Sequence, residues 1–423
     1  MMPSLTARVV VLAVAALGLV AASTWSLRLG LADYWFQKET PEDTEKALAL
    51  TPGQSAYHVR LALLTGDQDP ASALAALRRA VALNPNDGRA WIELGLRLES
   101  TGDLPLAEQS LLRAAEADKT YLPRWTLLNY YSRRNDVNRF WFWAKAAVPM
   151  IYGDPLPLFH MCARIGEDGA LIDRLEIRKP EVQAAYLFYL LDTGRADLAG
   201  PSSRLLVAEN REVDVPVLLE SCDRSIEAGR IDDAVAIWQG LCQSRRLPFR
   251  APQGEGRPIL TNGDFAVSPS GHGFDWRLPA LEGIAATRED DPGGLRLTFS
   301  GAEAEKAESL IQFIPVLENT GYEFGFAYYT AGIESRSGLS WQIVDARGGA
   351  NLQGGEDIAS NQQIDRRLAF VTPPGCRMVR LSLVYQRRPG TTRIGGFIVL
   401  RNLRLNRSPD IPAAAGPGGL AFR

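Results

Sequence analysis

Residues 88–121 read GRAWIELGLRLESTGDLPLAEQSLLRAAEADKTY, and this stretch decides how the first half of the chain folds. Apolar residues recur every three or four positions on both sides of Gly102 and Asp103, which predicts two amphipathic helices joined by a tight turn. Small residues at Gly95 and Ala107 allow the two helices to cross closely. Because one such hairpin cannot bury its apolar face alone, we expect neighbouring hairpins on both sides.

The pattern recurs along the chain at a spacing of 34 residues. The residues that stand 34 positions before Trp91, Ala107, Leu111, Ala114 and Lys119 are Tyr57, Ala73, Leu77, Ala80 and Pro85. At the same offset after them, the positions of Trp91, Leu94 and Gly95 are taken by Trp125, Leu128 and Asn129. This spacing resembles the tetratricopeptide (TPR) family of helix–turn–helix repeats. The resemblance implies an α-helical solenoid of about four to six hairpins over residues 38–244, with a weaker pattern after residue 151.

A partner-binding face follows from the TPR resemblance. In that family the first helix of each hairpin lines a concave groove that binds extended peptides or partner surfaces. The matching positions in this chain are Ser55, His58, Arg89, Ile92, Leu96, Glu99, Thr126, Tyr130 and Arg133. The resemblance therefore implies envelope proteins as partners in this groove, whereas the alternative is a solvated helix surface without a partner.

The first 28 residues contain an uncharged apolar run. Val9–Leu27 carries no charge and follows Arg8, and about 20 apolar residues suffice to cross a bilayer. We interpret residues 1–28 as a transmembrane signal-anchor, while a signal peptide cleaved after Val20-Ala21-Ala22 stays open. Positive charge before the run and acidic residues after it predict a cytoplasmic N-terminus. The predicted location is a bacterial inner membrane, crossed once, with the bulk of the chain in the periplasm.

The sequence periodicity changes in the second half of the chain. Residues 245–258 combine prolines, glycines and clustered arginines, which predicts a linker. Apolar and polar residues then alternate, which predicts strands at 295–297, 310–315, 322–328, 339–343, 368–371, 379–385 and 397–405. Such strands predict a β-sandwich, a jelly roll over residues 259–406, and the Pro/Gly-rich residues 407–423 predict a flexible tail. The predicted fold class is α + β multidomain, a TPR-type helical solenoid followed by a β-sandwich.

Short motifs in the second domain resemble the galactose-binding-like fold of carbohydrate-binding modules. They are Asn262-Gly263-Asp264-Phe265, the following Trp276, Phe370-Val371-Thr372-Pro373-Pro374, and Arg401-Asn402 before an apolar pair. Many relatives place a Glu after the opening Phe and an Asp in the last strand, where both help to bind structural Ca²⁺. This chain has Ala266 and Arg401 there, and an arginine opposes a cation, so we expect no calcium site of that type.

The same resemblance implies that the second domain binds a glycan. A sugar site needs a flat aromatic ring and hydrogen-bonding side chains on one face. Alternation predicts one polar face in the second domain, whose candidate glycan-binding residues are Glu323, Tyr329, Gln342, Arg380, Ser382 and Gln386. Trp276 and Trp341 are expected in the core instead, since Trp341 alternates in phase with Leu339 and Ile343.

Residue patterns for catalysis, metals and cofactors are missing from the sequence. His58 and His160 lack metal-ligand spacing, no nucleophile-elbow or phosphate-loop motif occurs, and nothing fixes two carboxylates at a glycosidase separation. The four cysteines are scattered among apolar neighbours, and a net charge of −3 gives no footprint for nucleic acid. We expect no catalytic site, no cofactor, no metal and no nucleic-acid partner.

These expectations lead to a function hypothesis. The chain is predicted to be a non-enzymatic, membrane-tethered scaffold outside the cytoplasm, with a TPR groove for protein partners and a lectin-like module. By analogy of architecture, it resembles bacterial envelope proteins of exopolysaccharide assembly or export. The alternative is a carbohydrate-binding protein whose jelly roll binds a polysaccharide, with the solenoid as a spacer.

Overall fold

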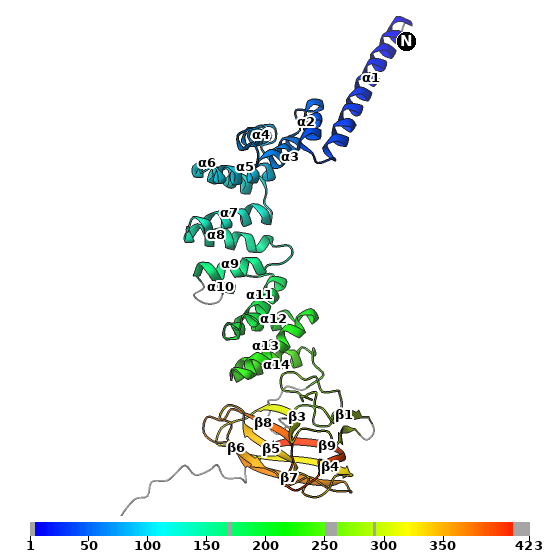
Figure 1. Cartoon of the computed structure of the whole chain (residues 1–423), viewed down its shortest axis with the longest axis vertical. Helices are drawn as coiled ribbons and strands as arrows, with labels where there is room; N and C mark the ends of the chain where they lie inside the picture. The colour runs from blue at the N-terminus through cyan, green and yellow to red at the C-terminus, as the bar shows by residue number, and fades with distance from the viewer. Residues whose placement is uncertain (1–4, 167–170, 250–259, 291–292, 409–423) are drawn as a thin grey trace, which may run out of the picture. The chain divides into compact units, whose positions relative to one another are not determined.

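The computed structural model describes residues 5–166, 171–249, 260–290 and 293–408. It confirms the predicted fold class, because an α-helical region is followed by an antiparallel β-sandwich (Figure 1). Contacts between residues divide the chain into two compact units, Met1–Arg178 and Lys179–Arg423, so the last helices belong to the same unit as the sandwich. Most of the predicted linker 245–258, and the predicted tail from residue 409 onward, lie outside the described residues.

Helices in the first unit pack in pairs (Figure 1). They are α1 Leu5–Phe36, α2 Pro41–Leu50, α3 Ser55–Thr65, α4 Pro70–Leu83, α5 Gly88–Ser100, α6 Leu104–Ala117, α7 Tyr121–Arg133, α8 Val137–Ala147, the 3₁₀ helix η1 Val148–Met150, α9 Leu156–Gly166 and α10 Leu171–Arg174. The contacting pairs are α1 with α2, α3 with α4, α5 with α6, and α7 with α8. Contacts of α4 with α5 and of α6 with α7 join each pair to the next, as expected for stacked hairpins.

Aspartate side chains begin several of these helices. The residues that accept a hydrogen bond from the backbone N–H three residues later, at 3.0–3.3 Å, are Asp69, Asp87, Asp103 and Asp136. Such caps satisfy N–H groups that the first helical turn leaves unpaired, and each contributes about 1 kcal/mol. Gly102, with φ of 87°, makes the turn before Asp103, where any residue with a Cβ atom would be strained.

Helices α5 and α6 cross closely at Gly95. Ala107 and Leu111 of α6 are completely buried. A Cβ atom placed on Gly95 would lie 2.6 Å from Leu111 Cδ2 and 3.2 Å from the Ala107 carbonyl oxygen. Because carbon atoms in contact stand about 3.5–4.0 Å apart, a side chain at position 95 would push the helices apart. The close crossing predicted from the two small residues is therefore confirmed.

Helix α1 carries the apolar run and also packs on the repeats. Its segment Val9–Phe36 is long and apolar enough to cross a membrane, by length and composition. Near its end, Ala32 is completely buried in one apolar cluster with Ala47 of α2 and Tyr57 of α3. The ring of Phe36 lies 4.5 Å from that of Tyr57. The helix thus continues without a break from the apolar run into the first helix pair.

The second unit begins with two further helix pairs. Its helices are α11 Pro180–Asp192, the 3₁₀ helix η2 Ala196–Leu198, α12 Ala199–Glu209, the 3₁₀ helix η3 Glu212–Asp214, α13 Val215–Glu227 and α14 Ile231–Gln243. Gly194 and Gly229 make the turns after α11 and α13 at φ of 73° and 70°, as their spacing predicts. Contacts of α11 with α13 and of α12 with α14 stack the two pairs.

The β-sandwich has two antiparallel sheets. The strands are β1 Ile284–Glu289, β2 Gly294–Ser300, β3 Lys306–Pro315, β4 Gly321–Ala331, β5 Leu339–Asp345, β6 Asn351–Gly354, β7 Ile364–Val371, β8 Met378–Gln386 and β9 Gly395–Arg407. One sheet has the order β1-β2-β9-β4-β7 and the other β3-β8-β5-β6. The eight strands from β2 to β9 have jelly-roll order, with β1 as an extra edge strand. The sequence analysis missed β1 and β6, because both are edge strands with few large apolar residues.

Large aromatic side chains fill the space between the sheets. Trp276 and Trp341 are completely buried with ring centroids 6.2 Å apart, which confirms both as core residues. The Nε1 of Trp276 donates a hydrogen bond to the Asn262 carbonyl oxygen at 3.1 Å. A Cβ atom at Gly263 would collide with the carbonyl oxygen of Leu403. The opening Asn-Gly-x-Phe motif therefore serves to close the core.

The last helices pack against the β3-β8-β5-β6 sheet. Trp238 of α14 is completely buried, and its ring centroid lies 6.0 Å from that of Phe274. Met378 at the start of β8 and Phe313 of β3 belong to the same apolar cluster. Both side chains leave the face of the sheet that is opposite to the sandwich core, since their neighbours in β8 and β3 point inward. The helices thus cover one end of this outer face.

A polar contact accompanies the apolar one. Asp223 of α13 accepts hydrogen bonds at 2.7 Å from the Gly273 backbone N–H, from Arg277 Nη2 and from His272 Nδ1. On α14, Asp232 accepts hydrogen bonds from both terminal nitrogens of Arg377, at 2.5 and 3.1 Å. Charged hydrogen bonds therefore fix the helices on the sandwich at two points.

Candidate functional site

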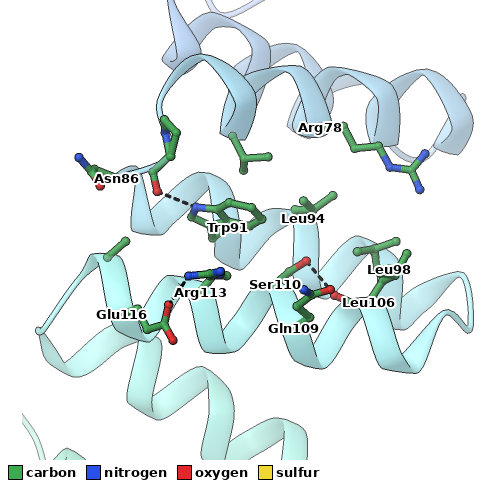
Figure 2. A pocket seen from close by; sticks show the side chains of 13 residues that line it. Arg78, Asn86, Trp91, Leu94, Leu98, Leu106, Gln109, Ser110, Arg113 and Glu116 are labelled. Atoms are coloured by element: carbon green, nitrogen blue, oxygen red, sulfur yellow. Dashed lines mark hydrogen bonds and ion pairs between the residues drawn. The ribbon is translucent and has the colours of Figure 1, made fainter.

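A groove opens between α4 and α6 in the first unit (Figure 2). Its volume is about 760 Å³. The residues that line it are Arg78, Val81, Pro85, Asn86, Trp91, Leu94, Leu98, Leu106, Gln109, Ser110, Arg113, Glu116 and Ala117. Helices α4 and α6, the second helices of two consecutive hairpins, form the walls, and α5 forms the floor.

The floor of the groove is apolar. Trp91, Leu94 and Leu98 stand three and four positions apart, so they share one side of α5. The Trp91 Nε1 donates a hydrogen bond to the Pro85 carbonyl oxygen at 2.9 Å, which holds the ring in place. Leu106 adds an apolar side chain from the first turn of α6 and is 43% exposed. Leu94 and Leu98 are buried, so the apolar surface open to another molecule is the half-buried Trp91 and, at the end of the groove near Leu98, the exposed Leu106 (Figure 2).

Charged residues border this floor (Figure 2). Arg113 forms an ion pair with Glu116 on the same helix at 2.7 Å. Arg78 on the opposite wall is exposed and makes no ion pair with any residue that the structure describes. Figure 2 shows Arg78 at the same end of the groove as Leu98, with Asn86 and Glu116 at the other end. One positive charge therefore stays unpaired at the rim.

The predicted partner-binding face lies on the other side of α5. Each residue of a helix turns by about 100° from the one before, so Ile92 and Leu96 point away from Trp91, Leu94 and Leu98. Several residues that the sequence predicts for this face are buried and form hydrogen bonds with neighbouring groups. Ser55 Oγ donates to Asp87 Oδ2 at 3.2 Å, Thr126 Oγ1 to the Leu122 carbonyl oxygen at 2.9 Å, and Tyr130 Oη to the Leu104 carbonyl oxygen at 3.1 Å.

These bonds, with the burial of Ile92, leave few free groups on that face. Glu99 of α5 accepts two hydrogen bonds from Arg133 of α7, at 2.9 and 2.7 Å. Burial alone would raise the pKa of Glu99, but the hydrogen bonds and charges of Arg133 and Arg134 outweigh it and lower that pKa. His58 Nε2 stands 3.0 Å from the Pro52 carbonyl oxygen.

Arg89 and Leu96 remain exposed, the latter at 38%. The structure thus brings Glu99 and Arg133 together as a contact between repeats, 34 positions apart in sequence. Partner binding by the remaining residues stays a prediction.

In the sandwich, the six predicted glycan-binding residues do not form one face. Gln342, Arg380, Ser382 and Gln386 belong to β5 and β8, whereas Glu323 and Tyr329 belong to β4 in the other sheet. The single polar face expected from the sequence is therefore two faces on opposite sides of the sandwich. Alternation tells which side chains leave the core, but it does not tell which sheet a strand joins.

The two faces differ in their free polar groups. On the β3-β8-β5-β6 sheet, Ser382 is buried, and Arg380 forms an ion pair with Glu308 at 2.8 Å. On the other sheet, Glu323 forms an ion pair with Arg367 at 3.2 Å. The ring of Tyr329 lies 6.0 Å from that of Phe397.

A pocket lies instead at the edge of the sandwich, between β6 and β7, the edge strands of the two sheets. Its volume is about 230 Å³. The lining residues are Phe326, Tyr328, Trp341, Gln353, Gly354, Gly355, Glu356, Asp357, Ile358, Arg366, Arg367 and Leu368. Trp341 Nε1 is buried and has no hydrogen-bond partner among the described residues. Burial raises the pKa of Tyr328 above its ordinary value.

Acidic and basic residues balance at this edge pocket. Glu356 stands 3.8 Å from Arg366, and Asp357 forms an ion pair with Arg388. Asp357 also accepts a hydrogen bond from the Gly338 backbone N–H at 3.0 Å. The sequence analysis missed this pocket because it did not predict β6 and because alternation does not tell that β6 and β7, consecutive in the chain, join different sheets. Gly354-Gly355 before two acids is a turn signal that could have marked the edge.

Arg401, at the position where many relatives have an acidic calcium ligand, is held by an ion pair and a hydrogen bond. Arg401 Nη2 stands 3.0 Å from Glu289 Oε2, and Arg401 Nε donates to the Gly293 carbonyl oxygen at 3.1 Å. The Arg401 guanidinium also lies 5.5 Å from the centre of the Tyr329 ring. In the described residues, no group of three or more His, Cys, Asp or Glu side chains could hold a metal ion.

Cysteine side chains are buried, as the sequence predicts. Burial raises the pKa of Cys162 and Cys242 to about 12 and that of Cys376 to about 11, and it raises the pKa of Cys222 as well. Since the thiolate is the reactive form, these thiols are poor nucleophiles at neutral pH.

Comparison with known proteins finds similarity in solved structures. No family model and no curated protein matches the chain. A structure of CBM4 has 13% identity and a TM-score of 0.28, and covers 35% of this chain and 99% of its own. TmCBM61 in complex with beta-1,4-galactotriose has 13% identity and a TM-score of 0.28, with 36% of this chain and 100% of its own covered. MamA has 19% identity and a TM-score of 0.26, with 33% and 81% covered. At identities and TM-scores this low, the proposals below rest on the geometry of the chain itself.

Proposed function

We propose that the β-sandwich is a glycan-binding module and that the edge pocket between β6 and β7 is its site. Trp341 carries this proposal. Its indole is completely buried and lines the pocket, and its Nε1 donor has no partner among the described residues. A buried donor without an acceptor costs about 1–3 kcal/mol. Because this nitrogen is itself buried, a sugar hydroxyl or ring oxygen in the pocket would accept this hydrogen bond only after the lining side chains move apart.

The rest of the lining fits a neutral sugar. Phe326 and Tyr328 supply a small apolar surface, and the polar and charged side chains of the lining can fix the orientation of a ligand. Glu356 and Asp357 are matched by Arg366 and Arg367, so the lining has no net charge to favour an acidic or a cationic sugar. The small volume suits one end or one branch of a glycan better than a long internal stretch.

Calorimetry with the full-length chain in detergent tests this proposal. The first probes are neutral oligosaccharides, beginning with beta-1,4-galactotriose, which is bound in one of the similar structures. Trp341→Phe removes the donor and keeps an aromatic ring, and about tenfold weaker binding is expected. Glu356→Ala, at a side chain that is 91% exposed, should weaken binding without changing the thermal melt.

The matched control for both variants is Gln342→Ala. Gln342 follows Trp341 in β5 and points to the other side of the sheet, so binding should not change. Loss of binding in this control, with unchanged binding in Trp341→Phe and Glu356→Ala, would place the sugar on the outer face of the β3-β8-β5-β6 sheet. Such a result would refute the edge pocket and leave glycan binding standing.

A second function is favoured by the groove between α4 and α6. We propose that the helix pairs are TPR hairpins that bind an envelope protein, and that α1 anchors the chain in the inner membrane with its bulk in the periplasm. The chain would then be a non-enzymatic scaffold in exopolysaccharide assembly or export. The close crossing at Gly95 and the Glu99–Arg133 pair at a spacing of 34 residues support the repeat assignment.

Photo-crosslinking in cells tests the scaffold proposal. A photoreactive residue is placed at Leu96, on the predicted face, or at Leu106, in the groove, since both side chains are exposed. Specific crosslinks to one envelope protein from either position support the proposal, and their absence from both positions contradicts it. Sequencing of the mature N-terminus in the same cells shows whether α1 is kept or cleaved.

A further inference from the structure

We infer that the groove between α4 and α6 binds an acidic amphipathic helix of a protein partner. This inference rests on the scaffold proposal above, and it names the surface and the chemistry of the partner. It also moves the binding surface from the face that the sequence predicts to the opposite side of α5.

The shape of the groove fits a helix. Two helices form its walls and α5 forms its floor, so a further helix can lie along it with one side chain row pointing down. The lining residues of α6 run from Leu106 to Ala117, which spans about 16 Å at the rise of an α-helix. A ligand helix of about three turns matches this length.

Apolar side chains of the ligand would contact a stripe that already has helical spacing. Trp91, Leu94 and Leu98 lie at positions i, i+3 and i+7 of α5. Leu94 and Leu98 are only 4% and 3% exposed, so the apolar surface open to a ligand is the half-buried Trp91 of α5 and the exposed Leu106 of α6. Apolar residues at the same spacing on the ligand can pack between them. Asn86, at the end of the groove opposite Leu98 (Figure 2), is exposed.

Charge complementarity selects an acidic ligand. The groove is lined by two arginines and one glutamate, because Arg78 and Arg113 face Glu116. Arg113 is already paired with Glu116, whereas Arg78 has no ion pair among the described residues. A carboxylate on the ligand helix would therefore find an unpaired partner in Arg78, and a lysine at that point would be repelled.

The partner-binding face predicted from the sequence has fewer free side chains for a partner. Thr126 and Tyr130 are buried in bonds to backbone carbonyl groups, and Glu99 and Arg133 neutralise each other. Leu96 is the exposed apolar residue that this face presents on α5. Arg89 on this face is also exposed and has no ion pair among the described residues, so the groove differs from this face by its hollow shape and by the half-buried Trp91 rather than by charge.

Three synthetic peptides of about 15 residues test the inference. The first carries a leucine stripe flanked by glutamates, the second has lysines in place of the glutamates, and the third has the composition of the first with the stripe scrambled. Binding to the full-length chain in detergent is measured by fluorescence anisotropy. The first peptide should bind about fivefold more tightly than the second, and the third should not bind.

Variants of the chain locate the binding. Leu106→Glu should abolish binding of the glutamate peptide, and Leu96→Glu is the matched control, with a similarly exposed leucine on the other side of α5. Arg78→Glu should reverse the preference, so that the lysine peptide becomes the tighter ligand. All three substitutions are at exposed positions, and unchanged thermal melts will show that the fold is kept.

Each other outcome overturns the inference. Binding that is lost in Leu96→Glu and kept in Leu106→Glu would place the partner on the face predicted from the sequence, with the scaffold proposal intact. Equal binding of the glutamate and lysine peptides would remove the role of Arg78. A dimer of the chain that dissociates in Leu106→Glu would show that a second copy covers the groove. No binding of any peptide would refute the groove as a helix site, whereas the scaffold proposal is decided separately by the crosslinks in cells.

Discussion

Asp223→Ala should destabilise the C-terminal unit, because this side chain ties α13 to the β-sandwich. The carboxylate accepts hydrogen bonds from the Gly273 N–H, from Arg277 and from His272, each at 2.7 Å. It is 21% exposed, so solvent replaces these partners incompletely. Its removal leaves the Gly273 N–H without this acceptor and Arg277 without its counter-charge.

The expected size follows from these contacts. A hydrogen bond to a charged group contributes about 1.5–3 kcal/mol when it is sheltered. We count the Gly273 and Arg277 bonds near the lower end of this range and neglect His272, which is 49% exposed. The expected loss is then about 3 kcal/mol. For a unit of this size, about 2–4 °C per kcal/mol gives a fall in melting temperature of about 6–12 °C.

The control is a second aspartate in the same contact. Asp232 on α14 is bonded to Arg377, but it is 80% exposed, and exposed pairs contribute at most about 1 kcal/mol. Thermal melts of residues 179–423, followed by circular dichroism, should therefore show a small shift for Asp232→Ala and a large one for Asp223→Ala. Equal shifts, or a larger shift for Asp232→Ala, would refute the assignment of the stabilising contact to Asp223.

Four further predictions concern the repeats and the sandwich. Ala107→Leu should overpack the crossing of α5 and α6 and cost about 1–3 kcal/mol, and an unchanged melting temperature would contradict the close crossing. Burial raises the pKa of Glu93, so the folded state favours the protonated side chain. The stability that this preference contributes is present at low pH and is lost as the pH rises through the folded pKa, so Glu93→Gln should be more stable than the parent chain at pH 7. The pKa of Glu99 is lowered overall, since Arg133 outweighs burial. The stability that this carboxylate contributes is therefore present above the unfolded pKa and is lost as the pH falls through the folded pKa, so Glu99→Gln should be less stable than the parent chain at pH 7. Thermal melts over about pH 4–8 should show the Glu93→Gln and Glu99→Gln variants converging on the parent chain in acid. Calcium should not raise the melting temperature of residues 179–423 above matched magnesium and sodium controls, because Ala266 and Arg401 replace the usual ligands, whereas a calcium-specific rise would show that other oxygens build a site.

Local signals in the sequence determined the helices, the turns and most of the strands. Helical periodicity, small residues at Gly95 and Ala107, and the glycine turns depend on contacts within one hairpin, so one sequence is enough to find them. Alternation likewise identified the inward side of the long strands and placed Trp276 and Trp341 in the core. It failed at β1 and β6, where few large apolar residues mark the inward side.

Only the tertiary structure decided where free surface and unpaired groups remain. The sequence predicts a large partner-binding face, but in the structure Glu99 and Arg133 of that face pair with each other between repeats. The groove on the other side of α5 keeps Arg78 unpaired. In the sandwich, the consecutive strands β6 and β7 join different sheets and meet at the edge, where Trp341 Nε1 has no partner among the described residues. Such properties depend on which distant elements cover a side chain, and residue spacing along one chain does not carry that information.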